Sequence, residues 1–371
     1  MSSYGTALRW LLLATHVPPD GQGGGIVRYT TEMAVALDAR EDVDLRVLCS
    51  VDSVPLFRTL TPGAGVVPAP ALPRSAMAAF ERWGVGGARS GPGYDVVQGT
   101  KHLLPRGLRA TSVLTVHDMI LVDRPADFDL LKRHLLRRPY LASLRDADVL
   151  ACVSEATAVR VRDRLPGVRD RIRIIPLATS SALLTVPAQP VEQLRDTAFA
   201  MVVGDPSPRK NLPVVIDAWA DVSSRAPGGV LAIVGPDSWG QTRYGAMFDR
   251  LQAQGRLLRL TNLDDARLRW CYENASVVLC PSLVEGFGLP AVEALDFGAP
   301  LVTSFDPALC EVSRDRALHL PADRVDLWTS AIGEAMARGR PAPVPGPLPR
   351  SWSDVAAQTV SAVQERGAAR P

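Results

Sequence analysis

The sequence predicts an α/β protein with two Rossmann-like domains, each built on a doubly wound parallel sheet. Its length of 371 residues fits two to three domains of roughly 150 residues each. With 47% hydrophobic residues, the chain can bury more than one core. Short apolar runs alternate with segments of helical periodicity, and this alternation occurs twice along the chain. We therefore expect two sheets facing a cleft, with ligands at the carboxyl ends of the strands.

The first series of elements defines an N-terminal domain over residues 1–186. A helix is expected between the first two strands, over 29–39, because apolar residues recur there at helical spacing. The stretch 186–190 contains two prolines and is interpreted as a linker. The predicted strands of this domain are 10–14, 45–49, 96–98, 113–116, 149–153 and 172–176.

The second series defines a C-terminal domain over residues 187–350. Helices are expected to start near residues 212, 246, 265, 290 and 323, and the proline-rich segment 338–350 is expected to be extended. A last helix follows within 351–371, capped by Ser351, and should pack back on the N-terminal domain. The predicted strands are 199–203, 230–234, 257–260, 277–280 and 301–303.

Composition excludes several classes of function. The balance of 41 basic and 39 acidic side chains, with few aromatic residues, argues against nucleic-acid binding. Five scattered cysteines are typical of reduced thiols in a cytosolic protein. The apolar run 10–14 is shorter than a signal-peptide core, and no run approaches the ~20 residues of a membrane span. We expect a cytoplasmic protein.

One segment, residues 130–138, is basic and amphipathic. It could lie on an anionic membrane, which would make the protein peripheral at the inner membrane face. The preferred interpretation is that Leu131, Leu135 and Leu136 pack inward while the charged side chains face water.

The most informative motif runs from Pro281 to Glu293, where a predicted strand leads through a glycine-containing loop into a helix. The helix N-terminus and the backbone N–H groups of the loop form an anion site suited to a diphosphate. Glu285 and Glu293 flank this loop and could accept hydrogen bonds from sugar hydroxyls. Alternatively, Glu293 only complements the helix dipole and Glu285 is a solvated loop residue. The loop residues predicted to bind the ligand are Gly286, Phe287, Gly288 and Leu289.

A second motif, from Gly204 to Leu212, again connects a strand to a helix. Arg209 offers a planar fork matched to phosphate oxygens, and Lys210, one of only three lysines, offers a compact ammonium. The N-terminus of a helix carries a partial positive charge, so two cations at this position are unfavourable on their own. Their presence therefore indicates an anionic ligand and argues against a basic pair that only faces water.

Two weaker signals lie in the N-terminal domain. The glycine-rich turn containing Gly24 and Gly25 follows the first strand, but it lacks the spacing of a dinucleotide fingerprint and could be a flexible loop. His117 directly follows the predicted strand 113–116 and could meet a sugar hydroxyl or an acceptor, with a structural histidine whose hydrogen bonds are satisfied as the alternative.

Together these strings resemble the retaining glycosyltransferases of family 4, which have the two-domain GT-B fold. The resemblance covers most of the chain, and its most specific part is Glu-Gly-Phe-Gly-Leu-Pro-x-x-Glu at 285–293. The other matching strings are Gly-Gly-Ile-Val-Arg-Tyr at 24–29, Val-His-Asp at 116–118, Ala-Asp-Val-Leu-Ala-Cys-Val-Ser-Glu at 147–155 and Arg-Lys-Asn at 209–211.

The resemblance implies a role for each matching residue. Arg209 and Lys210 would bind the donor diphosphate and stabilise the leaving group, while Glu285 would contact the donor sugar and Glu293 the ribose. Gly24 and Gly25 would let the domain approach phosphate and acceptor, and His117 would line the sugar site. Gly204 and Asn211, which flank the basic pair, are expected in the donor site as well.

The sequence departs from the family pattern at two places. Ala178 and the pair Thr261-Asn262 stand where the family often has glycine, and the second departure leaves the nucleotide base open. We expect no metal and no other cofactor, because the basic pair and helix N-termini can neutralise a diphosphate. Three Asp-x-Asp pairs, a metal-binding motif in another transferase fold, occur at about the frequency chance gives: Asp42/Asp44, Asp127/Asp129 and Asp146/Asp148.

The resemblance thus implies a retaining, metal-independent transferase that moves a sugar from a nucleotide diphosphate donor to a hydroxyl. The acceptor stays open between a cell-surface glycan, a lipid-linked intermediate and a small natural product, as does the oligomeric state. The alternatives are a non-catalytic helper of a partner transferase and a nucleotide-sugar epimerase or hydrolase. Closure of the domains about 186–190 is expected to complete the site and exclude water.

Overall fold

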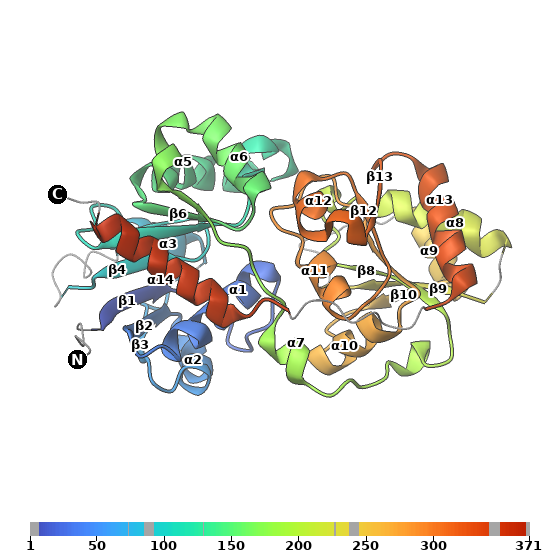
Figure 1. Ribbon diagram of the computed structural model, residues 1–371, viewed down its shortest axis with the longest axis horizontal. Coiled ribbons are helices and arrows are strands. Elements are labelled where there is room, and N and C mark those ends of the chain that lie inside the picture. The colour runs from blue at the N-terminus through green and yellow to red at the C-terminus, as the bar shows by residue number, and fades with distance from the viewer. Residues whose placement is uncertain are drawn as a thin grey trace. The chain divides into compact units, whose positions relative to one another are not determined.

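The computed structural model describes residues 7–72, 74–84, 93–128, 130–225, 228–236, 245–340 and 349–368. The chain divides into two compact units (Figure 1). The N-terminal unit contains the chain up to Leu177 together with the segment from Ser351 onward, and the C-terminal unit runs from Ala178 to Arg350. Each unit is built on one parallel sheet, as the sequence predicts.

The N-terminal unit has a seven-stranded sheet with the order β3-β2-β1-β4-β5-β6-β7. All neighbouring strands are parallel. The strands are β1 (Leu8–Leu13), β2 (Val43–Cys49), β3 (Gly65–Pro68), β4 (Val96–Gly99), β5 (Thr111–Val116), β6 (Val149–Cys152) and β7 (Ile172–Ile174). Its helices are α1 (Gly25–Asp38), η1 (Val51–Ser53), α2 (Val54–Leu60), α3 (Arg74–Ala79), η2 (Phe80–Gly84), α4 (Ile120–Asp123), η4 (Pro125–Asp127), α5 (Leu130–Asp146), α6 (Glu155–Arg164), η5 (Pro166–Arg171) and α14 (Trp352–Ala368).

The last helix, α14, belongs to the N-terminal unit although it follows the C-terminal unit in sequence. Its Trp352 ring meets the Tyr29 ring of α1 edge to face, with centroids 5.7 Å apart. The helix starts with reciprocal capping: Ser351 Oγ accepts from the Asp354 backbone N–H at 3.2 Å, and Asp354 Oδ2 accepts from the Ser351 N–H at 2.9 Å. Ser351 is therefore the cap that the sequence predicts.

The C-terminal unit has a six-stranded sheet with the order β10-β9-β8-β11-β12-β13, and its neighbouring strands are parallel. The strands are β8 (Phe199–Val203), β9 (Val230–Val234), β10 (Leu257–Leu260), β11 (Val277–Cys280), β12 (Leu301–Ser304) and β13 (Leu318–Leu320). The helices are α7 (Ser181–Thr185), η6 (Glu192–Leu194), η7 (Pro208–Lys210), α8 (Leu212–Arg225), α9 (Ala246–Ala253), α10 (Asp265–Asn274), α11 (Leu289–Asp296), α12 (Pro307–Ser313), η8 (Arg314–Arg316) and α13 (Val325–Arg338).

The strands β8, β9 and β11 of the C-terminal sheet are buried along nearly their whole length, which explains their continuous apolar sequences. In β8 and β11, side chains that point to opposite faces belong to different core clusters: Met201 and Val278 to one, Ala200 and Val277 to the other. Parallel sheets covered by helices on both sides have this pattern. For this reason the apolar runs give the bounds of β8, β9, β10 and β11 as predicted.

The unit boundary differs from the predicted one. It falls between Leu177 and Ala178, not at 186–187, because the stretch 186–190 is fixed to the C-terminal unit. Arg269 Nη1 donates to the carbonyls of Leu184 and Val186 at 2.8 and 2.9 Å, and the Gln189 N–H donates to Ala266 O at 3.1 Å. The interpretation of 186–190 as a free linker is therefore wrong. Most of the expected extended segment 338–350 lies outside the described residues.

The basic segment 130–138 forms the first half of α5, and one of its leucines is placed differently from the prediction. Leu136 packs against the core cluster of the N-terminal unit, as expected, but Leu135 is 54% exposed. The Leu131 side chain lies outside the described residues. Among the helices that the structure describes, none is long and apolar enough to span a membrane.

Candidate functional site

The loops that follow β8 and β11 meet at one edge of the C-terminal sheet. The two strands are direct neighbours, with Val277 beside Ala200 and Val278 beside Met201, so their carboxyl ends lie together. The Leu283 N–H donates to Arg209 O at 2.7 Å and joins the loops directly. The two motifs singled out in the sequence, around residues 209 and 285, therefore form one site.

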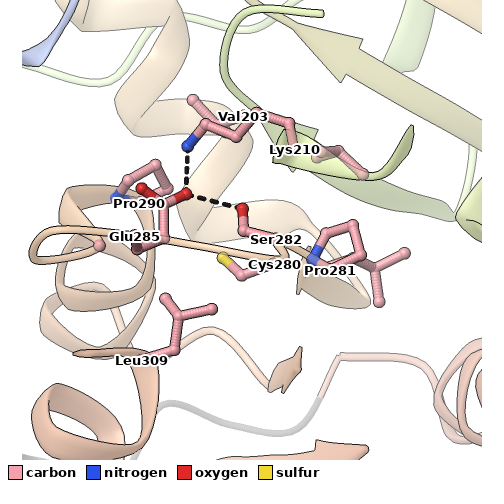
Figure 2. Close-up of a pocket in the computed structure, with 11 residues that line it drawn as sticks. Val203, Lys210, Cys280, Pro281, Ser282, Glu285, Pro290 and Leu309 are labelled. Atoms are coloured by element: carbon pink, nitrogen blue, oxygen red, sulfur yellow. Dashed lines mark hydrogen bonds and ion pairs between the residues drawn. The ribbon is translucent and has the colours of Figure 1, made fainter. Parts of the chain in front are cut away.

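Glu285 is the centre of this site (Figure 2). Its Oε1 accepts from Lys210 Nζ and from Ser282 Oγ, both at 2.6 Å, and its Oε2 accepts from Arg209 Nη1 at 3.1 Å. Only 10% of the Glu285 side chain is exposed, against 11% for Lys210 and 24% for Arg209. A solvated loop position, the alternative considered for Glu285, is therefore wrong.

The two cations keep Glu285 ionised. Burial by itself would raise the pKa of this carboxyl, but the charges of Lys210 and Arg209 and the hydrogen bonds outweigh it and hold the pKa below its usual value. Arg209 also donates through Nη2 to Asp205 Oδ2 at 3.2 Å. The pKa of Asp205 is lowered in the same way, because Arg209 offsets the effect of burial. The cluster thus holds two cations and two carboxylates.

Backbone geometry places the basic pair. Gly204 has a φ of +147°, and a Cβ there would lie 3.1 Å from Lys210 Cε, so glycine lets the lysine stem cross the end of β8. Asn211 has a φ of +52°, which asparagine tolerates. Its Nδ2 donates to Pro281 O at 3.2 Å and to Ala322 O at 2.7 Å. Both residues thus help to position the basic pair in the free protein.

The motif from Pro281 to Glu293 opens α11 as predicted. Gly288 precedes the helix with a φ of +97°, and a Cβ there would lie 2.6 Å from Leu309 Cδ2, so only glycine fits without a shift. The N-cap residue Gly288 has no side chain that could cap this helix, whose first residue is Leu289. Gly286 and Phe287 are buried beside it. Binding of a diphosphate by the N–H groups of this loop stays a prediction.

Glu293 lies in a different environment from Glu285. It is 3% exposed and its Oε2 accepts from Tyr272 Oη on α10 at 2.6 Å. It is not among the residues that line the small hollow around Glu285, which include Lys210, Cys280, Ser282, Gly288 and Pro290. A contact of Glu293 with a ribose stays a prediction.

Two further observations describe the side chains of this unit. Burial raises the pKa of the Cys280 thiol to about 12, so this group is protonated at neutral pH and is no nucleophile. Among the described residues, no group of three or more His, Cys, Asp and Glu side chains is arranged to hold a metal ion.

Asn262 follows β10 with a φ of +56°, a left-handed conformation that asparagine tolerates, and this explains how it can stand where the family often has glycine.

His117, Gly24 and Gly25 lie in the N-terminal unit. His117 follows β5 and hydrogen-bonds through Nε2 to Thr100 O at 2.9 Å. Gly24 is the residue before α1, whose first residue is Gly25, and a Cβ at Gly24 would meet nothing within 4 Å. The packing of the free protein therefore does not require glycine at position 24.

Three residues of the site were missed by the sequence analysis. Ser282 stands inside the quoted motif, three residues before Glu285, and its hydroxyl could have been considered. Asp205 follows Gly204 directly and could have been found as a partner of Arg209. Tyr272 left no local signal, because it lies beside Glu293 only in the folded C-terminal unit, where Tyr272 belongs to the same core cluster as Ala291 and Ala294 of α11.

Two family models match the chain, one in each unit. The model described as "Glycosyltransferase Family 4" matches residues 23–180, and the model described as "Glycosyl transferases group 1" matches residues 189–343. The first match includes Gly24, Gly25 and His117, and the second includes the motifs 204–212 and 281–293.

The chain is also similar to proteins with established names. It is 26% identical over 253 residues to the O-antigen chain mannosyltransferase B of Escherichia coli, covering 65% of each chain. It is 29% identical over 279 residues to the MMP alpha-(1->4)-mannosyltransferase of Mycolicibacterium hassiacum, covering 70% of this chain and 66% of the relative. The chain thus spans slightly less than two thirds of the length of these relatives.

A solved structure shares the fold. The structure of WaaG, a glycosyltransferase involved in lipopolysaccharide biosynthesis, superposes with a TM-score of 0.68 over 98% of this chain and 96% of WaaG. The two sequences are 16% identical, so this likeness shows the arrangement of the chain and nothing about substrates.

Proposed function

The chain belongs to glycosyltransferase family 4, and from this premise we propose that it transfers a sugar from a nucleoside diphosphate sugar to an acceptor hydroxyl. We propose further that the transfer retains the anomeric configuration and needs no metal ion. The observation that carries the proposal is the buried ion-pair cluster in which Lys210 and Arg209 converge on Glu285.

In this proposal, Lys210 and Arg209 bind the diphosphate of the donor. A buried cation needs a counter-charge, which Glu285 supplies in the free protein. A diphosphate brings negative charge to the same two cations and can take over this role. When the bond between the sugar and the diphosphate breaks, charge grows on the leaving oxygen, and fixed cations stabilise it. The positive charge that other transferases take from a metal ion would come from these side chains.

Glu285 would then be available to the donor sugar. Once a diphosphate pairs with Lys210 and Arg209, the Glu285 carboxylate can accept hydrogen bonds from sugar hydroxyls, which are donors. Because its pKa is held low, Glu285 stays ionised at neutral pH and can accept from such hydroxyls. This role agrees with the one that the family resemblance implies.

The same environment supports retention without a covalent enzyme intermediate. In the proposed complex Glu285 accepts hydrogen bonds from Ser282 and from sugar hydroxyls, which lowers its nucleophilicity, and the Cys280 thiol is protonated. The proposed step breaks the bond from the anomeric carbon to the diphosphate oxygen. It forms a bond from that carbon to the acceptor oxygen on the same face, and the acceptor proton moves to the leaving diphosphate. The protein contributes positioning and charge stabilisation.

The names of the relatives suggest which donors to test first. Two of them are named mannosyltransferases, so mannose is the first sugar to examine. The acceptor is proposed to be a glycan, a lipid-linked intermediate or a small natural product, and the base of the nucleotide is left to experiment.

The deciding experiment is calorimetric titration of the EDTA-treated protein with UDP, GDP, ADP and dTDP. We expect one diphosphate to bind, and the double variant Arg209→Ala/Lys210→Ala to abolish its binding. Arg324→Ala, which removes an exposed arginine of the same unit, serves as the matched control and should bind like the unchanged protein. Absence of binding by all four diphosphates would contradict the proposal and favour a non-catalytic helper.

Product analysis tests the reaction itself. The matching nucleotide sugar is incubated with candidate acceptors, and the anomeric configuration of the product is read by NMR. Retention without added metal is expected. Consumption of the donor in the absence of any acceptor would instead indicate a hydrolase or an epimerase.

A further inference from the structure

A third segment of the C-terminal unit supports the donor loop, which is residues 281–288 between β11 and α11. This segment is the β12–α12 connection, residues 304–309. Strand β12 is parallel to β11 and directly beside it, so the residues that follow the two strands lie at one edge of the sheet. The hydrogen bonds of the connection have no role in the chemistry derived above.

Ser304, the last residue of β12, holds the donor loop at its start. Its hydroxyl donates to the backbone carbonyl of Ser282 at 2.5 Å, and its oxygen accepts from the Asp306 N–H at 3.3 Å. Both serines are at most 2% exposed, so water has little access to these bonds. Asp306 is itself fixed, because its Oδ1 accepts from the N–H groups of Ala308 and Leu309 at the start of α12.

The Ser282 hydroxyl continues these hydrogen bonds to Glu285 (Figure 2). It donates to Glu285 Oε1 at 2.6 Å. A carbonyl and an ionised carboxylate can only accept, so the direction of both serine bonds is determined. A chain of hydrogen bonds therefore runs from Ser304 through Ser282 to Glu285 and connects β12 with the carboxylate.

The other end of the donor loop also contacts the β12–α12 connection. A Cβ at Gly288 would lie 2.6 Å from Leu309 Cδ2, so the leucine packs directly against the residue that precedes α11. Leu309 also lines the hollow around Glu285. The connection thus fixes the loop on both sides of Glu285.

The bond from Ser282 gains importance when a donor binds. In the proposed complex, Lys210 and Arg209 pair with the diphosphate and no longer hold Glu285. Of the three side-chain contacts of Glu285 described above, the one with Ser282 is the one that a diphosphate does not displace. With Oε1 anchored by Ser282, Oε2 is directed to the sugar hydroxyls.

We propose that Ser304 is a positioning residue of the donor site, which orients Glu285 toward the donor sugar by fixing Ser282. This inference rests on the proposed function and adds to it a residue that touches neither the donor nor a reacting atom. Without the Ser304 hydroxyl, the Ser282 carbonyl loses its buried donor and the start of the loop can shift. A small displacement of a group that positions a substrate is enough to slow the reaction.

The first test measures Glu285 in the absence of any donor. Burial raises the pKa of Glu285, while the charges of Lys210 and Arg209 and the hydrogen bonds from Lys210 and Ser282 lower it. We expect Ser282→Ala to decrease the acid dissociation constant of Glu285 about tenfold and Ser304→Ala about threefold. Carbon-13 NMR of labelled glutamate carboxyls in the full chain gives this constant, and Glu285→Gln assigns the signal. An unchanged constant in Ser304→Ala would overturn the inference.

Ser313→Ala is the matched control. Ser313 is fully buried in the same unit, and its hydroxyl also donates to a backbone carbonyl at 2.5 Å, that of Leu309. The variant removes the same atoms from a similar environment but breaks no bond to the donor loop. Both the Glu285 constant and turnover should stay at the values of the unchanged protein. Equal changes in Ser313→Ala and Ser304→Ala would show a general effect of losing a buried hydroxyl and contradict the proposal.

A double-mutant cycle on sugar transfer tests whether Ser304 acts through Ser282. We expect kcat to fall about tenfold in Ser282→Ala and about fivefold in Ser304→Ala. The dissociation constant of the diphosphate should change by less than about twofold, because both cations remain in place. The double variant should be no slower than Ser282→Ala alone, whereas independent effects would multiply to about fiftyfold. A multiplied loss, or an unchanged kcat in Ser304→Ala, would refute the positioning role.

A second substitution covers the case in which Ser304→Ala does not fold. Ser304→Cys keeps a side chain of similar size with a weaker donor, and it should lower kcat about threefold. Turnover in Ser304→Cys equal to that of the unchanged protein would then overturn the inference.

The inference and the proposed function fail on different results. If the unchanged protein binds a diphosphate and transfers sugar while Ser304→Ala behaves like Ser313→Ala, the inference fails and the proposed function stands. If the unchanged protein binds no diphosphate and transfers no sugar, the proposed function fails, whatever the NMR titration shows for Glu285.

Discussion

Replacing Glu285 by glutamine should destabilise the protein and at the same time tighten diphosphate binding. The carboxylate lies 2.6 Å from Lys210 Nζ and 3.1 Å from Arg209 Nη1. At an effective dielectric constant of about 20, the attraction to Lys210 alone is about 6 kcal/mol before desolvation is subtracted. Removing one partner of a buried ion pair lowers the free energy of unfolding by roughly 3–5 kcal/mol. Because Arg209 is partly exposed, we expect a loss of about 3 kcal/mol for Glu285→Gln.

The effect on the ligand has the opposite sign. In the free protein Glu285 and a diphosphate compete for the same two cations, and glutamine removes the competing charge. We expect the dissociation constant of the preferred diphosphate to fall by about tenfold, which corresponds to about 1.4 kcal/mol. Turnover should fall, because the donor sugar loses a charged acceptor.

Urea unfolding and calorimetry test both effects on the full chain. A protein with two units need not unfold in a single step. Hydrogen exchange of peptides from the C-terminal unit therefore identifies which unfolding transition belongs to that unit. The matched control is Glu273→Gln, whose carboxylate pairs with Arg269 at 2.7 Å with both side chains partly exposed. That change should cost about 0.5 kcal/mol. Equal destabilisation by the two variants, or weaker diphosphate binding in Glu285→Gln, would refute the reasoning.

The pH dependence of the same variant follows from linkage. The folded pKa of Glu285 lies below its unfolded value of about 4.3, so its stabilisation is present above that pH and is lost as the pH falls through the folded pKa. The stability difference between unchanged protein and Glu285→Gln should therefore be full at pH 7 and shrink below about pH 4. A difference that stays constant down to pH 3 would contradict the assignment.

Three further predictions concern the two units and the proposed independence of transfer from a metal ion. Lys210→Ala and Arg209→Ala should each weaken diphosphate binding about tenfold to hundredfold in calorimetry, since each removes a charge-assisted hydrogen bond, and unchanged affinity would remove the residue from the site. EDTA should leave transfer rates unchanged in a donor-consumption assay, whereas loss of activity restored by Mg²⁺ or Mn²⁺ would show a metal requirement. His16 is neutral in the folded protein down to a pKa of about 3, while the unfolded chain takes up its proton near pH 6.5. Stability is therefore lost as the pH falls below about 6.5, and His16→Gln should flatten the dependence of unfolding free energy between pH 6.5 and 4.

Several features of the fold could be predicted because they depend on local sequence. The strands β8, β9 and β11 of the C-terminal unit are buried along nearly their whole length, so each is a continuous apolar run that is followed by glycine or proline. Short elements gave no such signal: β3, β13 and α12 are three to seven residues long and were not predicted. The position of Leu135 was wrong because a helical pattern does not reveal which apolar side chains have a neighbour to cover them.

The residue types of the candidate site were determined by the sequence, while their pairing was decided by the tertiary structure. Arg209, Lys210 and Glu285 stand in motifs from which the sequence predicts a diphosphate site. That Lys210 and Glu285, separated by 75 residues, form an ion pair follows from the strand order, in which β8 lies beside β11. Strand order depends on how whole elements pack, and no local pattern encodes it. The same reason explains why Tyr272 beside Glu293, and Ser304 beside Ser282, were visible only in the folded chain.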